Sequence, residues 1–143
     1  MKFTINSPKQ TEQIGFDLAK RLDERGIKQA FIALDGEMGV GKTVFTRGFA
    51  SYFDISGVRS PTYTIVNEYR GARADIFHFD LYRIEDGDDL CSIGYDDYLR
   101  RQGYAIAEWS LRVPEDIPED AIFVTINRAE GEEDGRIIEI SDF

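Results

Sequence analysis

The chain has 143 residues, 42% of them hydrophobic and 13% aromatic, which suits one domain with a hydrophobic core of its own. With 27 acidic and 17 basic residues the net charge is −10, and this charge repels phosphate backbones, so we expect no direct, tight binding of nucleic acid. The single cysteine excludes an internal disulfide framework, and no segment approaches the ~20 apolar residues of a membrane span, so we expect a cytoplasmic protein without a membrane partner.

The first predicted elements are a short edge strand at Phe3–Ile5 and a helix that follows it. Ser7 fits the N-cap of this helix, Pro8 fits its first position, and Gln10 completes a capping box. Thr11, one turn into the helix, is expected from this pattern to face solvent. The buried face is marked by apolar residues that recur every four positions: Ile14, Leu18 and Leu22.

Residues 36–43 read GEMGVGKT and match the phosphate-binding pattern G-x-x-x-x-G-K-[ST]; we call this segment the glycine-rich loop. The apolar run Ala30–Leu34 predicts a buried strand before it, and Phe45, Phe49 and Phe53 share one face of a predicted helix after it. Strand, loop and helix in this order direct backbone N–H groups and a helix N-terminus at an anion. We therefore predict nucleotide contacts from Gly36, Glu37, Met38, Gly39, Val40, Gly41, Lys42 and Thr43.

Two side chains of the loop carry specific chemistry. Lys42 supplies a cation for the β- and γ-phosphates, and Thr43 supplies a hydroxyl group for Mg²⁺. A hydroxyl group downstream of such a helix often reaches the metal as well, and Thr62 and Thr64 are candidates, although most threonines in strands are structural. The guanine-reading sequence N-K-x-D is absent, which favours ATP over GTP. The predicted cofactors are ATP or ADP and Mg²⁺.

Residues 63–69 and 75–82 are rich in β-branched and aromatic residues and predict two antiparallel strands. The second strand carries Asp80 at the end of an apolar stretch, which is the Walker B arrangement for a carboxylate that holds Mg²⁺ directly or through water. His78 is the only histidine, and we expect a structural rather than a catalytic role because no partner for it is apparent.

Acidic residues dominate 85–89, for which a solvated loop is expected, and residues 90–101 predict one or two short helices. Residues 104–107 read YAIA and predict a strand, and its two small alanines allow it to pack tightly beside the strand of the glycine-rich loop. This strand leads into Glu108 and Trp109, which gives a second carboxylate at a strand end. The predicted catalytic residues are therefore Lys42, Asp80 and Glu108, and the predicted metal ligands are Thr43, Asp80 and Glu108.

Residues 113–118 predict an irregular connector, and residues 121–127 and 136–140 predict a terminal hairpin. We predict one α/β domain over residues 1–143, a P-loop NTPase-like fold with a mixed β-sheet flanked by helices. Parallel strands are expected near the nucleotide and antiparallel hairpins at the edges. This set of groups suits slow ATP hydrolysis, while a small-molecule kinase and a nucleotide-gated binding module with negligible turnover stay open.

The chain resembles the TsaE (YjeE) family of small bacterial P-loop ATPases in four segments: GEMGVGKT, SPTYTIVNEY (60–69), FHFDLYR (77–83) and AEW (107–109). The resemblance extends from the first helix to the terminal hairpin, and only the acidic region around Cys91 departs from the family's leucine-rich stretch. It implies a role in making threonylcarbamoyladenosine beside the anticodon of tRNA. The implied partners are the TsaB and TsaD proteins, which carry out the transfer itself.

The same resemblance implies roles for individual residues. Thr43 and Glu108 would contact Mg²⁺, Asp80 would be the Walker B-like acid, and Trp109 would line the nucleotide site or the partner surface. Two further nucleotide contacts are implied, by the matching first helix and the end of the penultimate strand: Thr11 and Arg128.

Overall fold

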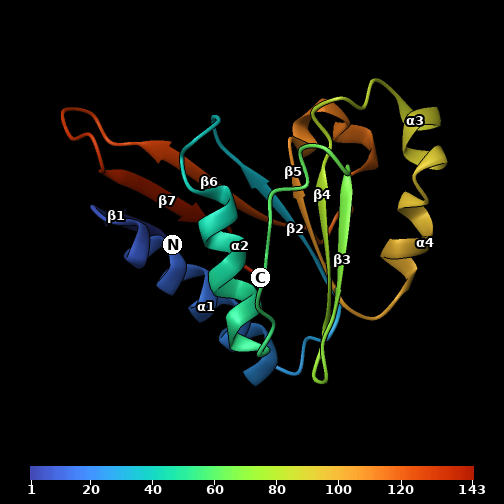
Figure 1. Cartoon of the computed structure of the whole chain (residues 1–143), viewed down its shortest axis with the longest axis horizontal. Helices are drawn as coiled ribbons and strands as arrows, with labels where there is room; N and C mark the ends of the chain where they lie inside the picture. The colour runs from blue at the N-terminus through green and yellow to red at the C-terminus, as the bar shows by residue number, and fades with distance from the viewer.

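The computed structural model describes residues 1–143 and has a seven-stranded β-sheet at its centre (Figure 1). The strand order across the sheet is β1-β7-β6-β2-β5-β4-β3. The middle strands run parallel to one another, which requires crossover connections between them. These strands are β6 (Ile122–Arg128), β2 (Ala30–Asp35), β5 (Tyr104–Glu108) and β4 (Asp75–Asp80).

Antiparallel strands complete the sheet at both edges. β3 (Val66–Arg70) pairs with β4, and β7 (Arg136–Ile140) pairs with β6. β1 (Lys2–Ile5) is the outer strand beside β7. The predicted mixed sheet, with parallel strands in the middle and hairpins at the edges, is therefore confirmed.

Helices cover both faces of the sheet (Figure 1). α1 (Pro8–Glu24) and α2 (Lys42–Tyr52) lie together on one face. The short helices α3 (Gly87–Ser92) and α4 (Tyr95–Arg100) lie on the other face. The glycine-rich loop joins β2 directly to α2, as the sequence pattern predicts.

Alternating side chains divide the core into two layers. In β2, Ile32 and Leu34 point to the face covered by α1 and α2, whereas Phe31 and Ala33 point to the opposite face. The first layer contains 22 buried hydrophobic residues and the second contains 12, so the larger part of the core supports the loop and α2. The parallel strands are hydrophobic on both sides because helices cover both sides.

α1 and α2 touch through their backbones at two glycines. A Cβ atom added to Gly48 of α2 would overlap the Glu12 carbonyl oxygen and lie 2.7 Å from the carbonyl carbon. A Cβ atom added to Gly15 of α1 would overlap the Phe45 carbonyl oxygen in the same way. Only glycine at both positions lets the helices pack this closely.

This close packing overturns the expectation that Thr11 faces solvent. Thr11 is buried, with 2% of its surface exposed, and it lies beside the glycine-rich loop. Its Cγ2 atom is 3.6 Å from the position that a Cβ atom would take on Gly41. The spacing of apolar residues along α1 could not show this, because the contact depends on glycines in two separate helices.

The strand predicted over residues 63–69 is shorter in the structure and begins at Val66. Residues 62–64 form a turn, and the Ile65 N–H donates to the Pro61 carbonyl oxygen at 2.8 Å. Ile65 has a φ of 71°, a left-handed conformation that is rare for a β-branched residue. The strand cannot extend through a residue in this conformation, so the prediction was wrong at that end.

The acidic segment predicted as a loop over residues 85–89 is partly helical. α3 begins at Gly87, and the Asp86 carboxylate caps it by accepting the Asp89 N–H at 3.1 Å. The connector after β5 is also more regular than expected, because it contains two 3₁₀ turns, η1 (Ser110–Arg112) and η2 (Pro114–Asp116).

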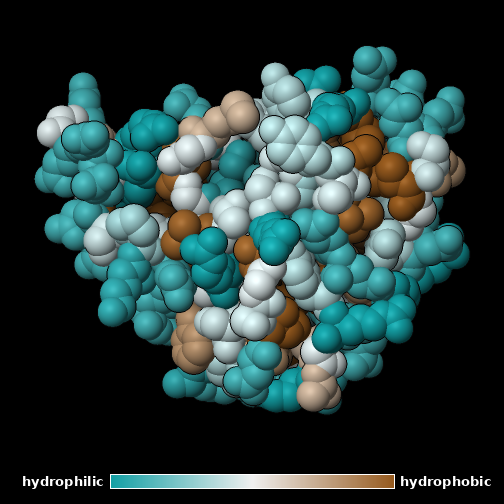
Figure 2. Space-filling model, viewed as in Figure 1, coloured by the Kyte–Doolittle hydropathy of each residue, from teal (hydrophilic) through white to brown (hydrophobic).

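None of the helices combines the length and the apolar composition that crossing a bilayer requires. The face of the molecule shown in Figure 2 is mainly hydrophilic, and its hydrophobic side chains lie in separate patches. No single apolar area dominates this face, in keeping with the large share of charged residues in the chain.

Candidate functional site

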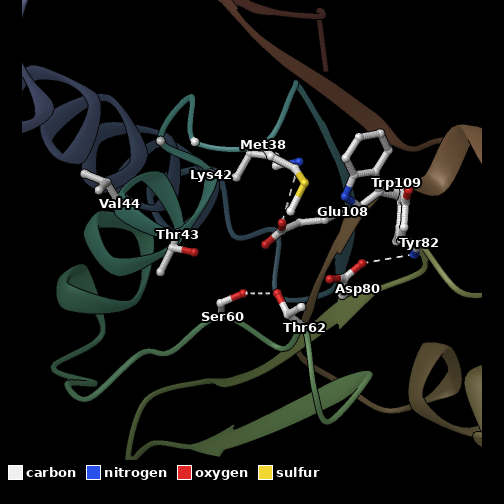
Figure 3. A pocket seen from close by; sticks show the side chains of 12 residues that line it. Met38, Lys42, Thr43, Val44, Ser60, Thr62, Asp80, Tyr82, Glu108 and Trp109 are labelled. Carbon is white, nitrogen blue, oxygen red and sulfur yellow. Dashed lines mark hydrogen bonds and ion pairs between the residues drawn. The ribbon is translucent and has the colours of Figure 1, made fainter. Parts of the chain in front are cut away.

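A cavity of about 360 Å³ opens at the carboxyl ends of β4 and β5, where the glycine-rich loop enters α2 (Figure 3). Ligands of open parallel sheets bind at this edge. Twelve residues line the cavity, and they come from the loop, the start of α2, the segment before β3, and the strand ends: Met38, Gly39, Gly41, Lys42, Thr43, Val44, Ser60, Thr62, Asp80, Tyr82, Glu108 and Trp109.

Glycines give the loop its shape. Gly36 packs against β6, where an added Cβ atom would lie 2.6 Å from the Ile126 carbonyl oxygen. Gly41 is the N-cap of α2 and has a φ of 117°, a region that favours glycine. The first N–H groups of α2 have no partner within the helix, and the residues that carry them line the cavity. Unpaired N–H groups at a helix N-terminus attract anions.

Lys42 is the only lysine or arginine that lines the cavity, and 6% of its surface is exposed. Its Nζ atom donates to the Gly36 carbonyl oxygen at 2.6 Å and lies 3.8 Å from Glu108 Oε1. The ammonium group also lies 4.3 Å from the centroid of the Trp109 ring. Burial lowers the pKa of Lys42, while nearby carboxylates, above all Glu108, oppose this shift.

Asp80 and Glu108 border the same cavity because β4 and β5 pair in register. The two residues are direct partners across the parallel strands, so their side chains leave the sheet on the same face. Both are buried, with exposed fractions of 9% and 5%. The Asp80 carboxylate accepts the Tyr82 N–H at 3.0 Å, and the Glu108 carboxylate is hydrogen-bonded to His78 Nε2 at 2.6 Å.

Side-chain hydroxyl groups also border the cavity (Figure 3). Thr43 lies on the first turn of α2, and the side-chain oxygens of Ser60 and Thr62 share a hydrogen bond of 2.6 Å. Thr64, the other candidate hydroxyl, donates to Asn67 Oδ1 at 2.6 Å and does not line the cavity. Thr62 is therefore the better placed of the two candidate threonines.

Two aromatic rings form another part of the wall. Trp109 directly follows β5 with a φ of 60°, and Tyr82 follows β4. Their ring centroids are 5.0 Å apart, with 62° between the ring planes. Tyr82 is half exposed, so this aromatic wall extends from the buried Lys42 ammonium group to the surface.

Asp35 contributes to the electrostatics of the site without lining the cavity. It is the last residue of β2, directly before the glycine-rich loop. Burial raises the pKa of Asp35, and the Lys42 ammonium group opposes the rise. Its charge in turn favours the protonated form of Lys42. The sequence prediction did not include this residue, although its place before the loop was visible.

Most of the predicted site residues meet at the cavity: Met38, Gly39, Gly41, Lys42, Thr43, Asp80, Glu108 and Trp109. The others do not line it. Val40 is buried in the core, and Glu37 is exposed and pairs with Arg128 at 3.9 Å. Arg128 also donates to a carbonyl oxygen of the loop at 3.2 Å, so it supports the loop from outside. Thr11 borders a separate hollow of about 140 Å³ beside the loop, and Gly36 packs against β6.

Some residues of the site were not predicted. Ser60, Tyr82 and Val44 line the cavity. An aromatic residue follows each strand-end carboxylate within two positions, and this repeated pattern was an available signal for Tyr82. His78, for which the sequence showed no partner, is hydrogen-bonded to Glu108.

Comparison with known proteins gives consistent matches. The family model described as "Threonylcarbamoyl adenosine biosynthesis protein TsaE" matches residues 5–138. The chain is 38% identical over 103 residues to the tRNA threonylcarbamoyladenosine biosynthesis protein TsaE of Bacillus subtilis. It is 41% identical over 101 residues to the protein of the same name from Haemophilus influenzae. These matches cover 71% and 70% of this chain, which spans 64% of the length of each relative.

A solved structure agrees with the sequence matches. The crystal structure of YdiB from Bacillus subtilis is similar to this fold, with a TM-score of 0.76 and 29% sequence identity. The match covers 96% of this chain and 82% of the YdiB chain. The similarity therefore includes the sheet, its flanking helices and the edge that carries the cavity.

Proposed function

The chain belongs to the TsaE family, and on this premise we propose that it binds ATP with Mg²⁺ in the cavity, hydrolyses ATP slowly, and serves the formation of threonylcarbamoyladenosine in tRNA. One observation supports this most strongly: Lys42, Thr43, Asp80 and Glu108 border a single cavity at the start of α2. In P-loop proteins a lysine, a hydroxyl group and a strand-end carboxylate hold the nucleotide phosphates and Mg²⁺ in this way.

The residues of the cavity suit Mg²⁺. Thr43 offers a hydroxyl oxygen, and Asp80 and Glu108 offer carboxylate oxygens. No group of three or more histidine, cysteine, aspartate or glutamate side chains is arranged to hold a metal by itself. Mg²⁺ commonly binds through one or two carboxylates together with substrate phosphates, so this sparse set fits an ion that arrives with the nucleotide.

The side chains of the site have distinct tasks in hydrolysis. Lys42 exchanges its contact with the Gly36 carbonyl oxygen for the β- and γ-phosphates, where its charge offsets the negative charge that develops in the transition state. Glu108 and Asp80 would hold the metal, or one of them would orient the attacking water. When bound, Mg²⁺ supplies further charge neutralisation. Positioning and charge provide most of the rate enhancement in this kind of reaction.

We propose that a protein partner completes the site. No arginine lines the cavity, although Arg83 and Arg112 contact the lining residues Thr62 and Tyr82 from outside it. The guanidinium groups of Arg83 and Arg112 are held by the carbonyl oxygens of Thr62 and Ile84, and Arg47 is exposed on α2. In related phosphoryl transfers, an arginine finger raises the rate by about 10³- to 10⁵-fold, so its absence leaves the reaction slow. The family resemblance proposes TsaD with TsaB as the partner that closes over the nucleotide.

The tRNA substrate is expected to be held by that partner rather than by this chain. The net charge of −10 opposes the approach of a phosphate backbone. The acidic surface is better suited to a protein face of opposite charge. This division of tasks leaves the chain to supply the nucleotide-dependent step.

Single-turnover ATP cleavage tests this proposal. We expect slow cleavage by the isolated chain with Mg²⁺, and an increase of about 10³-fold or more when TsaB and TsaD are added. Glu108→Ala should remove the increase but leave ATP binding, because Lys42 and the helix N-terminus still hold the phosphates. Cleavage at tens per second by the isolated chain would mean that the site is already complete and that the partner is not needed.

The same experiment separates the alternative functions. Glu24→Ala, at an exposed carboxylate on the last turn of α1, is the matched control and should keep the full partner effect. Transfer of the γ-phosphate to an added small molecule rather than to water would favour a kinase. ATP binding without cleavage, even with both partners present, would favour a nucleotide-gated binding module.

A further inference from the structure

The only histidine of the chain is buried next to the proposed metal site. His78 is fully buried, and its Nε2 atom lies 2.6 Å from Glu108 Oε2. Its other ring nitrogen, Nδ1, is buried without a hydrogen-bond partner. Buried polar atoms are normally paired, so a half-satisfied histidine beside a functional carboxylate requires an explanation.

The position of His78 follows from the register of the sheet. In β4, Ile76, His78 and Asp80 point to the same face, and Asp80 is paired directly with Glu108 of β5. His78 lies two residues before Asp80, towards the middle of the strand. Its ring therefore reaches the Glu108 carboxylate from the core side, while Asp80 lies beside that carboxylate at the cavity.

The hydrogen bond indicates which ring nitrogen of His78 carries the proton. An ionised carboxylate only accepts, so Nε2 donates to Glu108 Oε2. The other ring nitrogen, Nδ1, makes no hydrogen bond. The contact of Nε2 with Glu108 Oε2 is therefore the only hydrogen bond of the His78 ring.

We propose that His78 is a positioning residue for Glu108 as a metal ligand, an inference that rests on the function proposed above. The bond from Nε2 holds Oε2 on the core side and leaves Oε1 on the cavity side, 3.8 Å from Lys42 Nζ. Without this bond the carboxylate is free to turn both oxygens to the Lys42 ammonium group, and neither oxygen is then directed at Mg²⁺. His78 thus sets the orientation in which one oxygen of Glu108 is offered to the metal.

Two substitutions at His78 test this role. Leucine fills a similar volume without a donor, whereas glutamine carries an amide N–H₂ group that can replace the Nε2 donor. The measurement is the affinity for ADP by calorimetry, once in EDTA and once in Mg²⁺, with melting temperatures to verify the fold. Loss of a group that orients a metal ligand typically lowers metal affinity or activity by about 10- to 100-fold. We therefore expect His78→Leu to reduce the Mg²⁺-dependent increase in ADP affinity by about tenfold or more.

His78→Gln should restore most of that gain, and Ile76→Val, a conservative change on the same face of β4, should leave it unchanged. The affinity in EDTA should fall by less than the affinity in Mg²⁺. Three results would each overturn the positioning role. His78→Leu could lose the same factor of ADP affinity in EDTA and in Mg²⁺, or it could keep the wild-type increase in affinity from Mg²⁺. His78→Gln could also fail to restore that increase. A wild-type protein without any Mg²⁺-dependent gain would instead contradict the proposed metal site itself.

Discussion

Lys42→Ala should lower the affinity for ATP with Mg²⁺ by about ten- to a hundredfold, since a charge-assisted hydrogen bond contributes about 1.5–3 kcal/mol. The Lys42 ammonium group is the only protein cation that lines the cavity. Its removal leaves the phosphates with backbone N–H groups and the metal, without a protein cation. The fold should remain, because α2 is anchored in the core through Phe45 and Phe49, both fully buried.

Calorimetric titration with a non-hydrolysable ATP analogue measures this effect. Lys20→Ala, at an exposed lysine of α1, removes the same charge away from the cavity and should bind like the wild type. Thr43→Ala should lose affinity mainly in Mg²⁺ rather than in EDTA, because its hydroxyl group is proposed to contact the metal. Unchanged affinity in both Lys42→Ala and Thr43→Ala would refute the assignment of this cavity to the nucleotide.

Gly48→Ala should destabilise the folded protein by about 3 kcal/mol, at the upper end of the range for overpacked cores. The new methyl group would overlap the backbone carbonyl group of Glu12, and no flexible side chain is present to move aside. α1 would have to move away from α2. Thr11 would then lose its contact with the glycine-rich loop, so the affinity for nucleotide should fall as well.

Thermal unfolding measures the loss, and for a chain of this size about 3 kcal/mol corresponds to a decrease in melting temperature of roughly 10 °C. Gly87→Ala is the matched control, since a Cβ atom at Gly87 meets no atom within 4 Å and lies in the first turn of α3. It should leave the melting temperature unchanged or raise it slightly, because alanine favours helix more than glycine does. Equal melting temperatures for both variants would contradict the close contact between the two helices.

Local patterns were sufficient for most of the fold. The apolar run Ala30–Leu34 and the spacing of aromatic residues after the loop predicted β2 and α2, and the structure confirms both. The start of β3 was placed too early because β-branched and aromatic residues favour strands, and no pattern reveals the positive φ of Ile65. Burial of Thr11 was missed for a different reason, since it depends on the packing of two separate helices.

The residues of the candidate site also fall into two groups, those that a local motif predicts and those whose contacts depend on how the strands pair. Lys42 and Thr43 belong to one contiguous motif, so the sequence located them directly. Asp80 and Glu108 could be assigned to strand ends, but their pairing depends on the register of β4 with β5. The bond from His78 to Glu108 joins residues that are 30 positions apart and follows from that same register. Contacts of this kind arise only when the sheet assembles, so single segments of sequence do not carry them.

A crystal structure with a non-hydrolysable ATP analogue and Mg²⁺ tests most directly whether this cavity is the nucleotide site. We expect the triphosphate along residues 36–43, with Lys42 Nζ at the β- and γ-phosphates and Thr43 Oγ1 on the metal. The carboxylates of Asp80 and Glu108 should face the metal directly or through one water molecule. A nucleotide bound elsewhere, or a metal with none of Thr43, Asp80 and Glu108 around it, would contradict the proposed site.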